Sequence, residues 1–440
     1  MDILIKVIQL FLCFTLLVGI HELGHFLMAR VFGIRVEKFY IFFDPWFSLF
    51  KFKRGGTEYG VGWLPLGGYV KIAGMIDESM DKEQMKQPVK PDEFRAKPAW
   101  QRLLVMVAGV MMNVLLAIVI YCAVCYTWGD SYFSNQDAKW GYNFNPTAHE
   151  MGFRDGDRFV SIDGEEIDNV MRVQNDLLIT DGGRRVVVER GGEPVTLDIP
   201  FESLLRMRQE KAYEDLFTLR LPFIVDSVSY TSAVEAGLQS GDEVVAIDDL
   251  RDADYPRYRD YLQKHKNDKV LLTVRRDGAL IDSLALPVDA EGRIGVTVTN
   301  PYSLRTQYYT FWESIPAGIH KAGKTISSYW DQLKLIVQPK TKMYEELGGF
   351  VAIGSIFPGS WDWHDFWLKT AFLSIILAVM NLLPIPGLDG GHALFTLWEI
   401  ITRRKPSEKF LEVAQYVGLM IILALLVYAN GNDIYRFFIK

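Results

Sequence analysis

The stretch "LLVGIHELGHFLMAR", Leu16 to Arg30, combines a metal-binding pattern with the composition of a membrane helix. Residues four apart on a helix point in nearly the same direction, so His21 and His25 can hold one metal ion, with Glu22 beside it. A catalytic zinc takes three protein ligands and keeps one position for water. The stretch therefore predicts a zinc site that needs a third ligand from elsewhere in the chain.

This stretch lies in the first of four long apolar segments. Hydrophobic residues make up 49% of the 440 residues, yet 23% are charged, which indicates apolar spans joined to polar domains. Each segment approaches the ~20 residues that cross a bilayer, and the first shows no signal-peptide cleavage site. We expect four retained transmembrane helices, within Ile3 to Val31, Leu103 to Trp128, Phe366 to Leu383 and Val413 to Tyr428.

Basic residues predict the orientation of these spans. They cluster between the first and second spans and between the third and fourth, whereas "GDSYFSNQD" (residues 129–137), after the second span, has none. Cytoplasmic loops carry the excess of lysine and arginine. We therefore expect both basic loops in the cytoplasm and the segment from about 130 to 365 on the opposite face. The basic residues are Arg30, Arg35, Lys38, Arg95, Lys97, Arg102 and Arg403 to Lys405.

Charge and cysteine usage exclude other classes. The net charge of −7 indicates no nucleic-acid partner. Cys13, Cys122 and Cys125 all lie in apolar spans, so we expect no disulfide in the exported segment. No histidine or second cysteine pair accompanies "CAVC" (residues 122–125), and we interpret this pair as helix packing rather than a redox or metal site.

The exported segment contains a duplication. "AHEMGFRDGDRFVSIDGEEI" (residues 148–167) aligns without a gap with "AVEAGLQSGDEVVAIDDLRD" (residues 233–252), at an offset of 85 residues. In each copy a Gly-Asp turn leads into alternating apolar residues, which predicts a half-buried strand. The shared pattern resembles two tandem PDZ domains. Such modules bind peptides by adding a strand to a sheet edge, or they serve here as spacers.

A second polar stretch lies at membrane depth, "NLLPIPGLDGGHALF", Asn381 to Phe395. Its prolines and glycines predict a broken helix, which a membrane tolerates only inside the protein or along a cavity. An aspartate there is costly unless it is paired or bound to a metal, which makes Asp389 the leading candidate for the third ligand. His392 is the rival ligand, and a surface turn is the alternative for Asp389.

Together these motifs resemble the site-2 protease family, and within it the bacterial subgroup of the regulator of sigma E protease. The resemblance is carried by H-E-L-G-H, by N-x-x-P-x-P-x-L-D-G-G-H and by the PDZ repeats. It extends to "GTEYGVGWLPLGGYVKIAG" (Gly56 to Gly74) and "QRLLVMVAGVMMN" (Gln101 to Asn113). The resemblance implies that His21, His25 and Asp389 bind Zn²⁺, that Glu22 is the catalytic acid and base, and that Asn381 assists near the metal.

The expected fold class is a polytopic α-helical membrane protein of four transmembrane helices, with two exported α/β PDZ domains and a membrane-associated β-hairpin. We expect these parts in chain order: transmembrane helix 1 (residues 1–33), a cytoplasmic or re-entrant loop with the hairpin (34–100), transmembrane helix 2 (101–128), PDZ domain 1 (129–220), PDZ domain 2 (221–305), an amphipathic connecting region (306–365), transmembrane helix 3 with the L-D-G motif (366–398), a cytoplasmic loop (399–410) and transmembrane helix 4 (411–429).

The resemblance implies intramembrane proteolysis: cleavage of a single-pass membrane protein within or beside its transmembrane helix. Substrates of this class include an anti-sigma factor or a remnant signal peptide, already cut by another protease. The implied location is the bacterial inner membrane, with the active site towards the cytoplasm and the PDZ domains outside. The alternatives are a membrane-tethered PDZ adaptor with a structural metal site, which would not need Glu22, and a metal transporter, which would not need PDZ repeats.

Two further stretches bear on substrate and lipid contacts. The alternation in "TEYGVGWLPLGGYVKI" (residues 57–72) predicts a hairpin whose edge could hold an unwound substrate as an added strand, or a loop packed against the spans. Where the family often has a G-F-G turn, this chain reads "YIFFDPWF", Tyr40 to Phe47. Tyr308 to Val337 shows loose helical spacing with several aromatics, which predicts a helix on the outer membrane surface or one buried in the exported domain.

Overall fold

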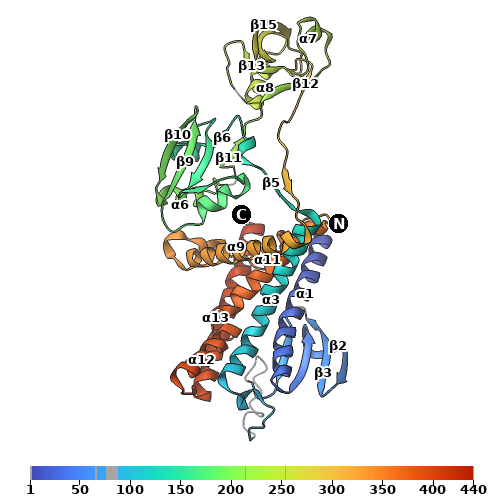
Figure 1. Cartoon of the computed structure of the whole chain (residues 1–440), viewed down its shortest axis with the longest axis vertical. Coiled ribbons are helices and arrows are strands. Elements are labelled where there is room, and N and C mark those ends of the chain that lie inside the picture. Colours follow the sequence, from blue (N-terminus) through green and yellow to red (C-terminus); the bar gives the residue numbers. More distant parts are fainter. Residues whose placement is uncertain (1, 65–66, 76–87, 214, 253, 440) are drawn as a thin grey trace. The chain divides into compact units, whose positions relative to one another are not determined.

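Among the residues that the computed structural model describes, four helices are long and apolar enough to cross a membrane, which confirms the four predicted spans. The structure describes residues 2–64, 67–75, 88–213, 215–252 and 254–439. The spans are α1 (Asp2–Val31), α3 (Ala99–Trp128), α11 (Trp363–Leu382) and Lys409–Phe437, most of which is α13 (Glu408–Ile434) (Figure 1).

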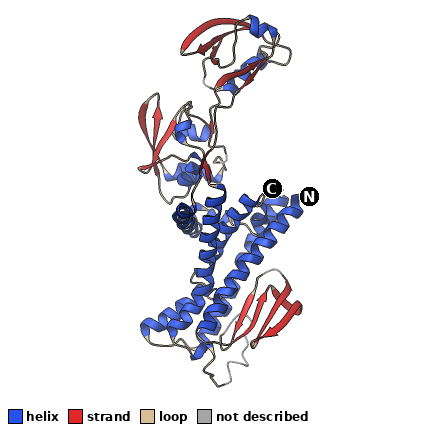
Figure 2. Ribbon diagram, turned by 45° about the vertical axis from the view of Figure 1, so that its right-hand side comes forward, coloured by secondary structure: helices blue, strands red, loops and turns tan. Residues whose placement is uncertain are grey.

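The chain divides into two compact units, which are described separately. The helical unit comprises Met1–Asp130 and Tyr308–Lys440, and the repeat unit comprises Ser131–Gln307. Figure 2 shows that helices dominate the first unit, apart from one sheet, whereas strands with short helices make up the second. The chain is therefore a polytopic helical membrane protein with β-rich parts, as the sequence predicts.

Helix α3 is the central helix of the helical unit, since it contacts α1, α9, α11 and α12. It crosses α1 at close range: a Cβ on Gly24 would lie 2.5 Å from the carbonyl oxygen of Ala108. On its other side, the hydroxyl of Ser374 in α11 donates a hydrogen bond to the carbonyl oxygen of Asn113, over 2.7 Å. These contacts hold the two histidines of α1 directly against α3.

Residues between α1 and α3 form a four-stranded mixed sheet of order β2-β3-β1-β4. The hairpin expected within residues 57–72 is wrong in its pairing, because β1 lies between β3 and β4, parallel to the first and antiparallel to the second. The hairpin is formed by β2 and β3. Gly55 and Gly56 join them with φ of +59° and +85°, the positive angles that a two-residue hairpin turn requires. The strands are β1 (Val36–Ile41), β2 (Phe43–Arg54), β3 (Thr57–Leu64) and β4 (Tyr69–Ile72).

A non-helical turn of residues 383–388 separates α11 from α12 (Asp389–Thr402). Two glycines let the chain fold tightly here, since a Cβ on Gly390 would lie 2.3 Å from the carbonyl oxygen of Leu382 and one on Gly391 would lie 2.5 Å from that of Ile385. Asp389 is thereby the first residue of α12. A salt bridge of 2.6 Å between Arg102 and Glu399 ties α12 to α3.

The amphipathic region forms α9 (Phe311–Val337), which begins at a capping box of Thr310 and Glu313. The helix runs across the spans α3 and α11 (Figure 1) and contacts both. A Cβ on Gly318 would lie 2.5 Å from the sulfur of Cys122, so "CAVC" serves as a packing surface. Helix α9 therefore belongs to the helical unit and not to the repeat unit. The short helix α10 (Phe350–Ser355) follows it.

The repeat unit contains two copies of one local structure. In both copies the aligned alanine and isoleucine are buried, and the aligned glycines have positive φ: +99° and +87° at Gly152 and Gly237, and +94° and +89° at Gly156 and Gly241. Each copy has its own apolar core. The duplication read from the sequence is thus a duplication of structure.

The first repeat holds a sheet of order β10-β9-β7-β8 and a two-stranded pair, β11-β6. The second repeat holds a sheet of order β15-β14-β13-β12-β16. Strands β5 and β17, where the chain enters and leaves the unit, pair with each other. The strands are β5 (Asp130–Tyr132), β6 (Tyr142–Phe144), β7 (Arg158–Ile162), β8 (Glu165–Glu166), β9 (Arg184–Arg190), β10 (Glu193–Ile199), β11 (Phe217–Leu219), β12 (Phe223–Val228), β13 (Glu243–Ile247), β14 (Lys269–Arg276), β15 (Ala279–Pro287), β16 (Val296–Val298) and β17 (Arg305–Gln307); the helices are α4 (Pro146–Glu150), α5 (Val173–Leu178), α6 (Phe201–Gln209), α7 (Thr231–Glu235) and α8 (Tyr255–Lys264).

A buried ion pair is repeated with the fold. Asp157 and Asp242, the aspartates of the two Gly-Asp turns, are about 1% and 0% exposed. Each accepts bidentate hydrogen bonds from an arginine on a neighbouring strand, at 2.6 to 2.7 Å, Arg190 in the first copy and Arg276 in the second. Each arginine also donates to the carbonyl of the first aligned glycine. The pair fixes the turn that leads into β7 in the first repeat and into β13 in the second.

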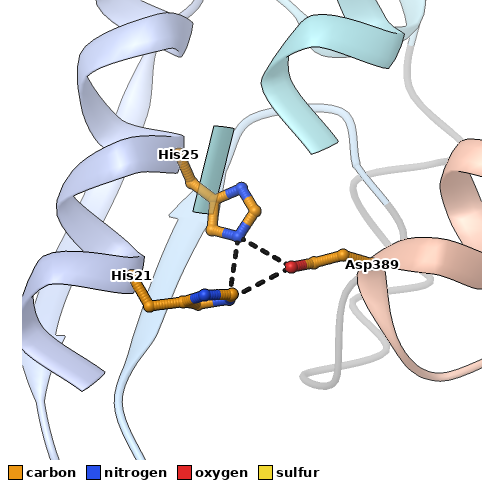
Figure 3. A group of neighbouring side chains, drawn as sticks. All are labelled: His21, His25 and Asp389. Carbon is orange, nitrogen blue, oxygen red and sulfur yellow. Dashed lines mark hydrogen bonds and ion pairs between the residues drawn. The ribbon is translucent and has the colours of Figure 1, made fainter. Parts of the chain in front are cut away.

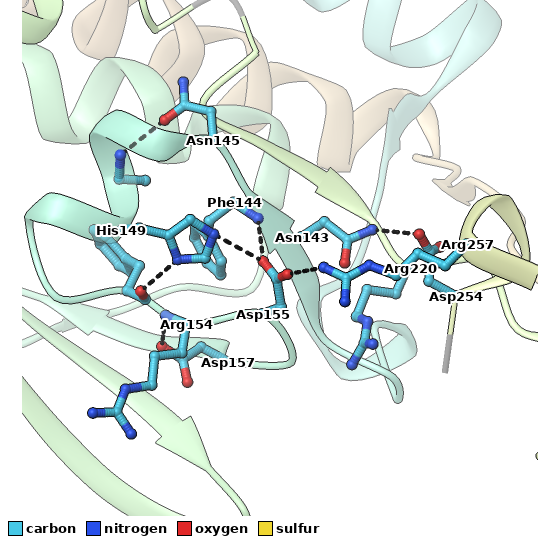
Figure 4. Close-up of polar contacts among 12 residues, drawn as sticks. Asn143, Phe144, Asn145, His149, Arg154, Asp155, Asp157, Arg220, Asp254 and Arg257 are labelled. Atoms are coloured by element: carbon cyan, nitrogen blue, oxygen red, sulfur yellow. Dashed lines mark hydrogen bonds and ion pairs between the residues drawn. The ribbon is translucent and has the colours of Figure 1, made fainter. Parts of the chain in front are cut away.

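Polar side chains join the two repeats (Figure 4). Asn143 donates to Asp254 over 2.8 Å, and Arg257 donates over 2.5 Å to Asp155, which also lies 3.3 Å from His149. Such partly exposed pairs contribute only ~0–1 kcal/mol each. They orient the repeats more than they stabilise them.

Candidate metal centre

Three side chains from two distant parts of the chain meet inside the helical unit (Figure 3). His21 and His25 come from adjacent turns of α1, and Asp389 comes from the N-terminus of α12. Their ligand atoms form a nearly equilateral triangle: His21 Nε2 lies 3.1 Å from Asp389 Oδ2, His25 Nε2 lies 3.2 Å from it, and the two nitrogens are 3.2 Å apart. Both histidines are buried.

The triangle has the dimensions of a tetrahedral zinc site. Zinc binds nitrogen and oxygen ligands at about 2.0–2.2 Å, so two ligand atoms of a tetrahedral site lie about 3.3–3.5 Å apart. The edges of 3.1 to 3.2 Å lie just below that range, close to the spacing that zinc requires. Three ligand atoms form one face of the tetrahedron, and the fourth position is left for water, as in catalytic zinc sites.

The protons of His25 point to the same conclusion. Its Nδ1 lies 2.8 Å from the carbonyl oxygen of Val105, which can only accept, so in a neutral imidazole Nδ1 carries the hydrogen. The lone pair of Nε2 then faces the carboxylate of Asp389 at 3.2 Å. Two electron pairs at this distance repel each other unless a proton or a metal ion lies between them. The donor set therefore fits a metal ion.

Gly109 leaves room at these ligand atoms. It lies on the face of α3 towards α1, and a Cβ there would be 2.4 Å from Nε2 of His25 and 2.9 Å from Nε2 of His21. Any side chain at this position would occupy space beside the ligand nitrogens. The absence of a side chain keeps that space free for a metal ion.

The other candidate residues have these positions. Glu22 is half-buried on α1 and lies beside β4: a Cβ on Gly68 would be 3.3 Å from its Cγ. Asn381 is half-buried in the last turn of α11, and His392 is half-buried in the first turn of α12. Among the described residues, the group that can share a metal consists of His21, His25 and Asp389, so it leaves out His392.

Sequence reasoning missed the neighbours that α3 supplies. Val105 acts through its backbone, Gly109 through its missing side chain, and Asn113 lies with its Nδ2 3.3 Å from Nδ1 of His21. The three residues are four apart, so they share one helical face. In the sequence, a glycine and an asparagine four residues apart in an apolar span are the indication that could have found them.

Comparisons with known proteins agree with this geometry. The model of "Peptidase family M50" matches residues 9–425. A "Putative zinc metalloprotease" of Clostridium perfringens is 29% identical, and the match covers 96% of each chain. A protein of the same name from Vibrio cholerae is 29% identical over 99% of each chain. The "Regulator of sigma E protease" of Haemophilus influenzae is 28% identical over 96% of this chain and 97% of its own.

The family match spans nearly the whole chain and includes both the helix of the two histidines and the turn before Asp389. It agrees with a site whose three ligand atoms fit zinc and with four helices able to cross a membrane. The chain therefore belongs to peptidase family M50, the site-2 protease family, and is a multi-pass membrane zinc metalloprotease that acts on protein substrates.

Proposed function

We propose that this protein cleaves single-pass membrane proteins within or beside their transmembrane helix, with His21, His25 and Asp389 as zinc ligands. The observation that carries the proposal is the location of the ligand triangle. Two of its members lie within a span of 30 residues, and the third begins the helix that follows another span. A peptide bond can reach such a site only from within the bundle or from the end of a span.

Glu22 is assigned to proton transfer. A zinc ion bound at this triangle would lower the pKa of a bound water and polarise the scissile carbonyl. Glu22 follows the ligand His21 directly, so its carboxylate can take the proton from the attacking water and return it to the leaving amine nitrogen. Asn381, eight residues before Asp389, is assigned to holding the substrate carbonyl through its amide N–H groups.

The sheet beside the site is assigned to holding the substrate. A transmembrane helix uses its carbonyls in internal hydrogen bonds, so a segment must unwind before cleavage. Strand β4 forms one edge of the sheet, and Gly68, just before it, lies next to Glu22. An unwound segment added to this edge would lie beside the catalytic group.

The β2–β3 hairpin, at the opposite edge of the sheet, is assigned to membrane association. On β2, the side chains of Trp46, Leu49 and Phe50 are 91%, 66% and 61% exposed, which supports this assignment.

The basic residues support one orientation in the membrane. Arg30 lies in the last turn of α1, five residues after His25, and Arg403 follows α12, so the metal centre lies towards the ends that carry positive charge. We assign these ends to the cytoplasm of a bacterial cell and the repeat unit to the outside of the inner membrane. Helix α9 would then lie along the outer lipid surface, with exposed Phe311, Trp312 and Trp330 as anchors.

The repeat unit is assigned to selecting substrates that another protease has already trimmed. It lies in the chain between α3 and α9. With the orientation assigned above, that segment is exported, as is the bulky domain of an uncut substrate. Two PDZ-like modules could exclude a bulky domain, or they could bind the new C-terminus left by the first cut. An anti-sigma factor or a remnant signal peptide has the required single span.

The test uses purified protein and one single-span substrate in an uncut and a trimmed form. The intact enzyme should cleave only the trimmed form, with zinc required and the cut mapped within or beside the span. Deletion of residues 131–307 should permit cleavage of the uncut form if the unit excludes bulk, and should abolish cleavage of the trimmed form if it binds the new terminus. If deletion changes neither, the unit has no role in selection. A metal-loaded protein that cuts neither form under any condition would contradict the proposed activity.

A further inference from the structure

We propose that Asn113 is a positioning residue of the metal centre: its side-chain oxygen accepts the Nδ1 hydrogen of His21 and so directs the Nε2 lone pair of that histidine to the metal. The inference rests on the proposed function only in taking His21 as a zinc ligand. It concerns a residue 92 positions away in the sequence, on a different helix.

The first observation is the burial of Asn113. Its side chain is 0% exposed within the second span, where water cannot satisfy its amide. Its Nδ2 lies 3.3 Å from Nδ1 of His21, whereas its Oδ1 is buried and has no hydrogen-bond partner. A buried amide oxygen without a partner costs about 1–3 kcal/mol. In this orientation the acceptor of the amide is unused.

The second observation is the chemistry of His21. A neutral imidazole has one N–H and one lone pair, so a zinc ligand at Nε2 must carry its hydrogen on Nδ1. Nδ1–H cannot pair with the N–H groups of Nδ2. A half-turn of the amide, which exchanges two groups of nearly equal shape, brings Oδ1 opposite Nδ1. This orientation gives Oδ1 a partner and removes the opposition of two N–H groups, and a His21 that binds the metal through Nε2 requires it.

The third observation is that His25 already has this arrangement on the same helix. The carbonyl of Val105 lies 2.8 Å from Nδ1 of His25, with no donor to compete. Val105, Gly109 and Asn113 are spaced four residues apart, so one stripe of α3 supplies the acceptor for one histidine, the open space for the metal and the acceptor for the other. Metal-bound histidines generally have such an acceptor at their second nitrogen.

A purely structural role for Asn113 makes a different prediction. The residue also joins helices through its backbone, since the Ser374 hydroxyl donates to its carbonyl oxygen. That bond does not depend on the side chain. If Asn113 served packing alone, leucine of similar size would replace it well, and an acidic side chain would be harmful. If it orients His21, aspartate should replace it and leucine should not.

The experiment measures the zinc dissociation constant of full-length protein in detergent, by competition with a fluorescent chelator. Asn113→Leu removes the acceptor while keeping bulk, and we expect its zinc affinity to fall about 10- to 100-fold, as for other lost partners of metal-bound histidines. Asn113→Asp keeps an acceptor in place, and we expect it to restore most of that loss. Ser374→Ala, which loses only the bond to the backbone of Asn113, should bind zinc as the wild type does.

Equal affinity of Asn113→Leu and the wild type would overturn the inference. So would equal losses in the leucine and aspartate variants, because the acceptor would then be irrelevant. His25→Ala is measured in parallel to separate this inference from the proposed zinc ligands. If that variant loses zinc while Asn113→Leu keeps it, the ligands stand and the positioning role fails. If His25→Ala keeps zinc at full affinity, both the ligand set and the role of Asn113 are wrong.

Discussion

The carbonyl oxygen of Pro386 lies so close to Gly418 of α13 that a Cβ on the glycine would be 1.3 Å from it. Pro386 precedes Asp389 by three residues, so the fourth span supports the turn that carries the third ligand. Gly418→Ala should push this turn aside. Because a displacement of 1 Å can reduce turnover ~100-fold, we expect a loss of that order in a cleavage assay, with weaker zinc binding.

Gly431 provides the matched control for Gly418, since it is also on α13 and a Cβ there would meet nothing within 4 Å. Gly431→Ala should leave cleavage unchanged, because the added methyl group displaces no neighbour. Alanine also favours the helix over glycine, by up to ~1 kcal/mol. Equal activity of the two variants would show that α13 does not support the ligand turn.

The role of Glu22 can be separated from metal binding. Glu22→Gln keeps the size of the side chain and both histidine ligands but cannot accept the proton of water. We expect zinc content to stay at the wild-type level while the rate of cleavage falls about 10²- to 10⁴-fold, the usual contribution of a general base. Substantial cleavage by this variant would remove Glu22 from the mechanism.

The buried ion pair of the second repeat should make its stability depend on pH. Burial raises the pKa of Asp242, but hydrogen bonds from Arg276 and from the backbone N–H of Gln239 outweigh it and hold the pKa below its ordinary value. A pKa depressed by folding gives stability that is present above the unfolded pKa of about 3.9 and is lost as the pH falls through the folded value.

Thermal unfolding of residues 131–307, followed by circular dichroism between pH 7 and pH 2, would measure this effect. Asp242→Asn should lower the midpoint at pH 7 and show a weaker acid dependence than the wild type. Asp282→Asn, at an exposed position on β15, is the control and should behave as the wild type does. The same acid dependence with and without Asp242 would mean that other groups cause it.

Much of this structure could be read from the sequence because the decisive features are local. The spacing of His21 and His25 sets their common direction on a helix, and the length of each apolar segment sets a span. Asp389 stood out because a carboxylate beside broken helix at membrane depth has few explanations. The repeats were visible because the Gly-Asp turn constrains the residues around it in the same way twice.

The missed features depend on contacts between distant segments. The insertion of β1 between β3 and β4 follows from three-dimensional packing that no alternation pattern records. Val105 and Asn113 meet the histidines across 80 and 92 residues of chain. Arg190 and Arg276 pair with the repeated aspartates from outside the aligned stretches, so the alignment alone could not identify them.

The central claim is that His21, His25 and Asp389 together hold the catalytic zinc, and the zinc content of two purified variants tests it most directly. Asp389→Ala removes one corner of the triangle, whereas His392→Ala removes the rival ligand on the same helix. We predict that the aspartate variant loses most of its zinc and all cleavage, and that the histidine variant keeps most of its zinc. Full zinc occupancy in Asp389→Ala, or loss of zinc in His392→Ala alone, would contradict the account.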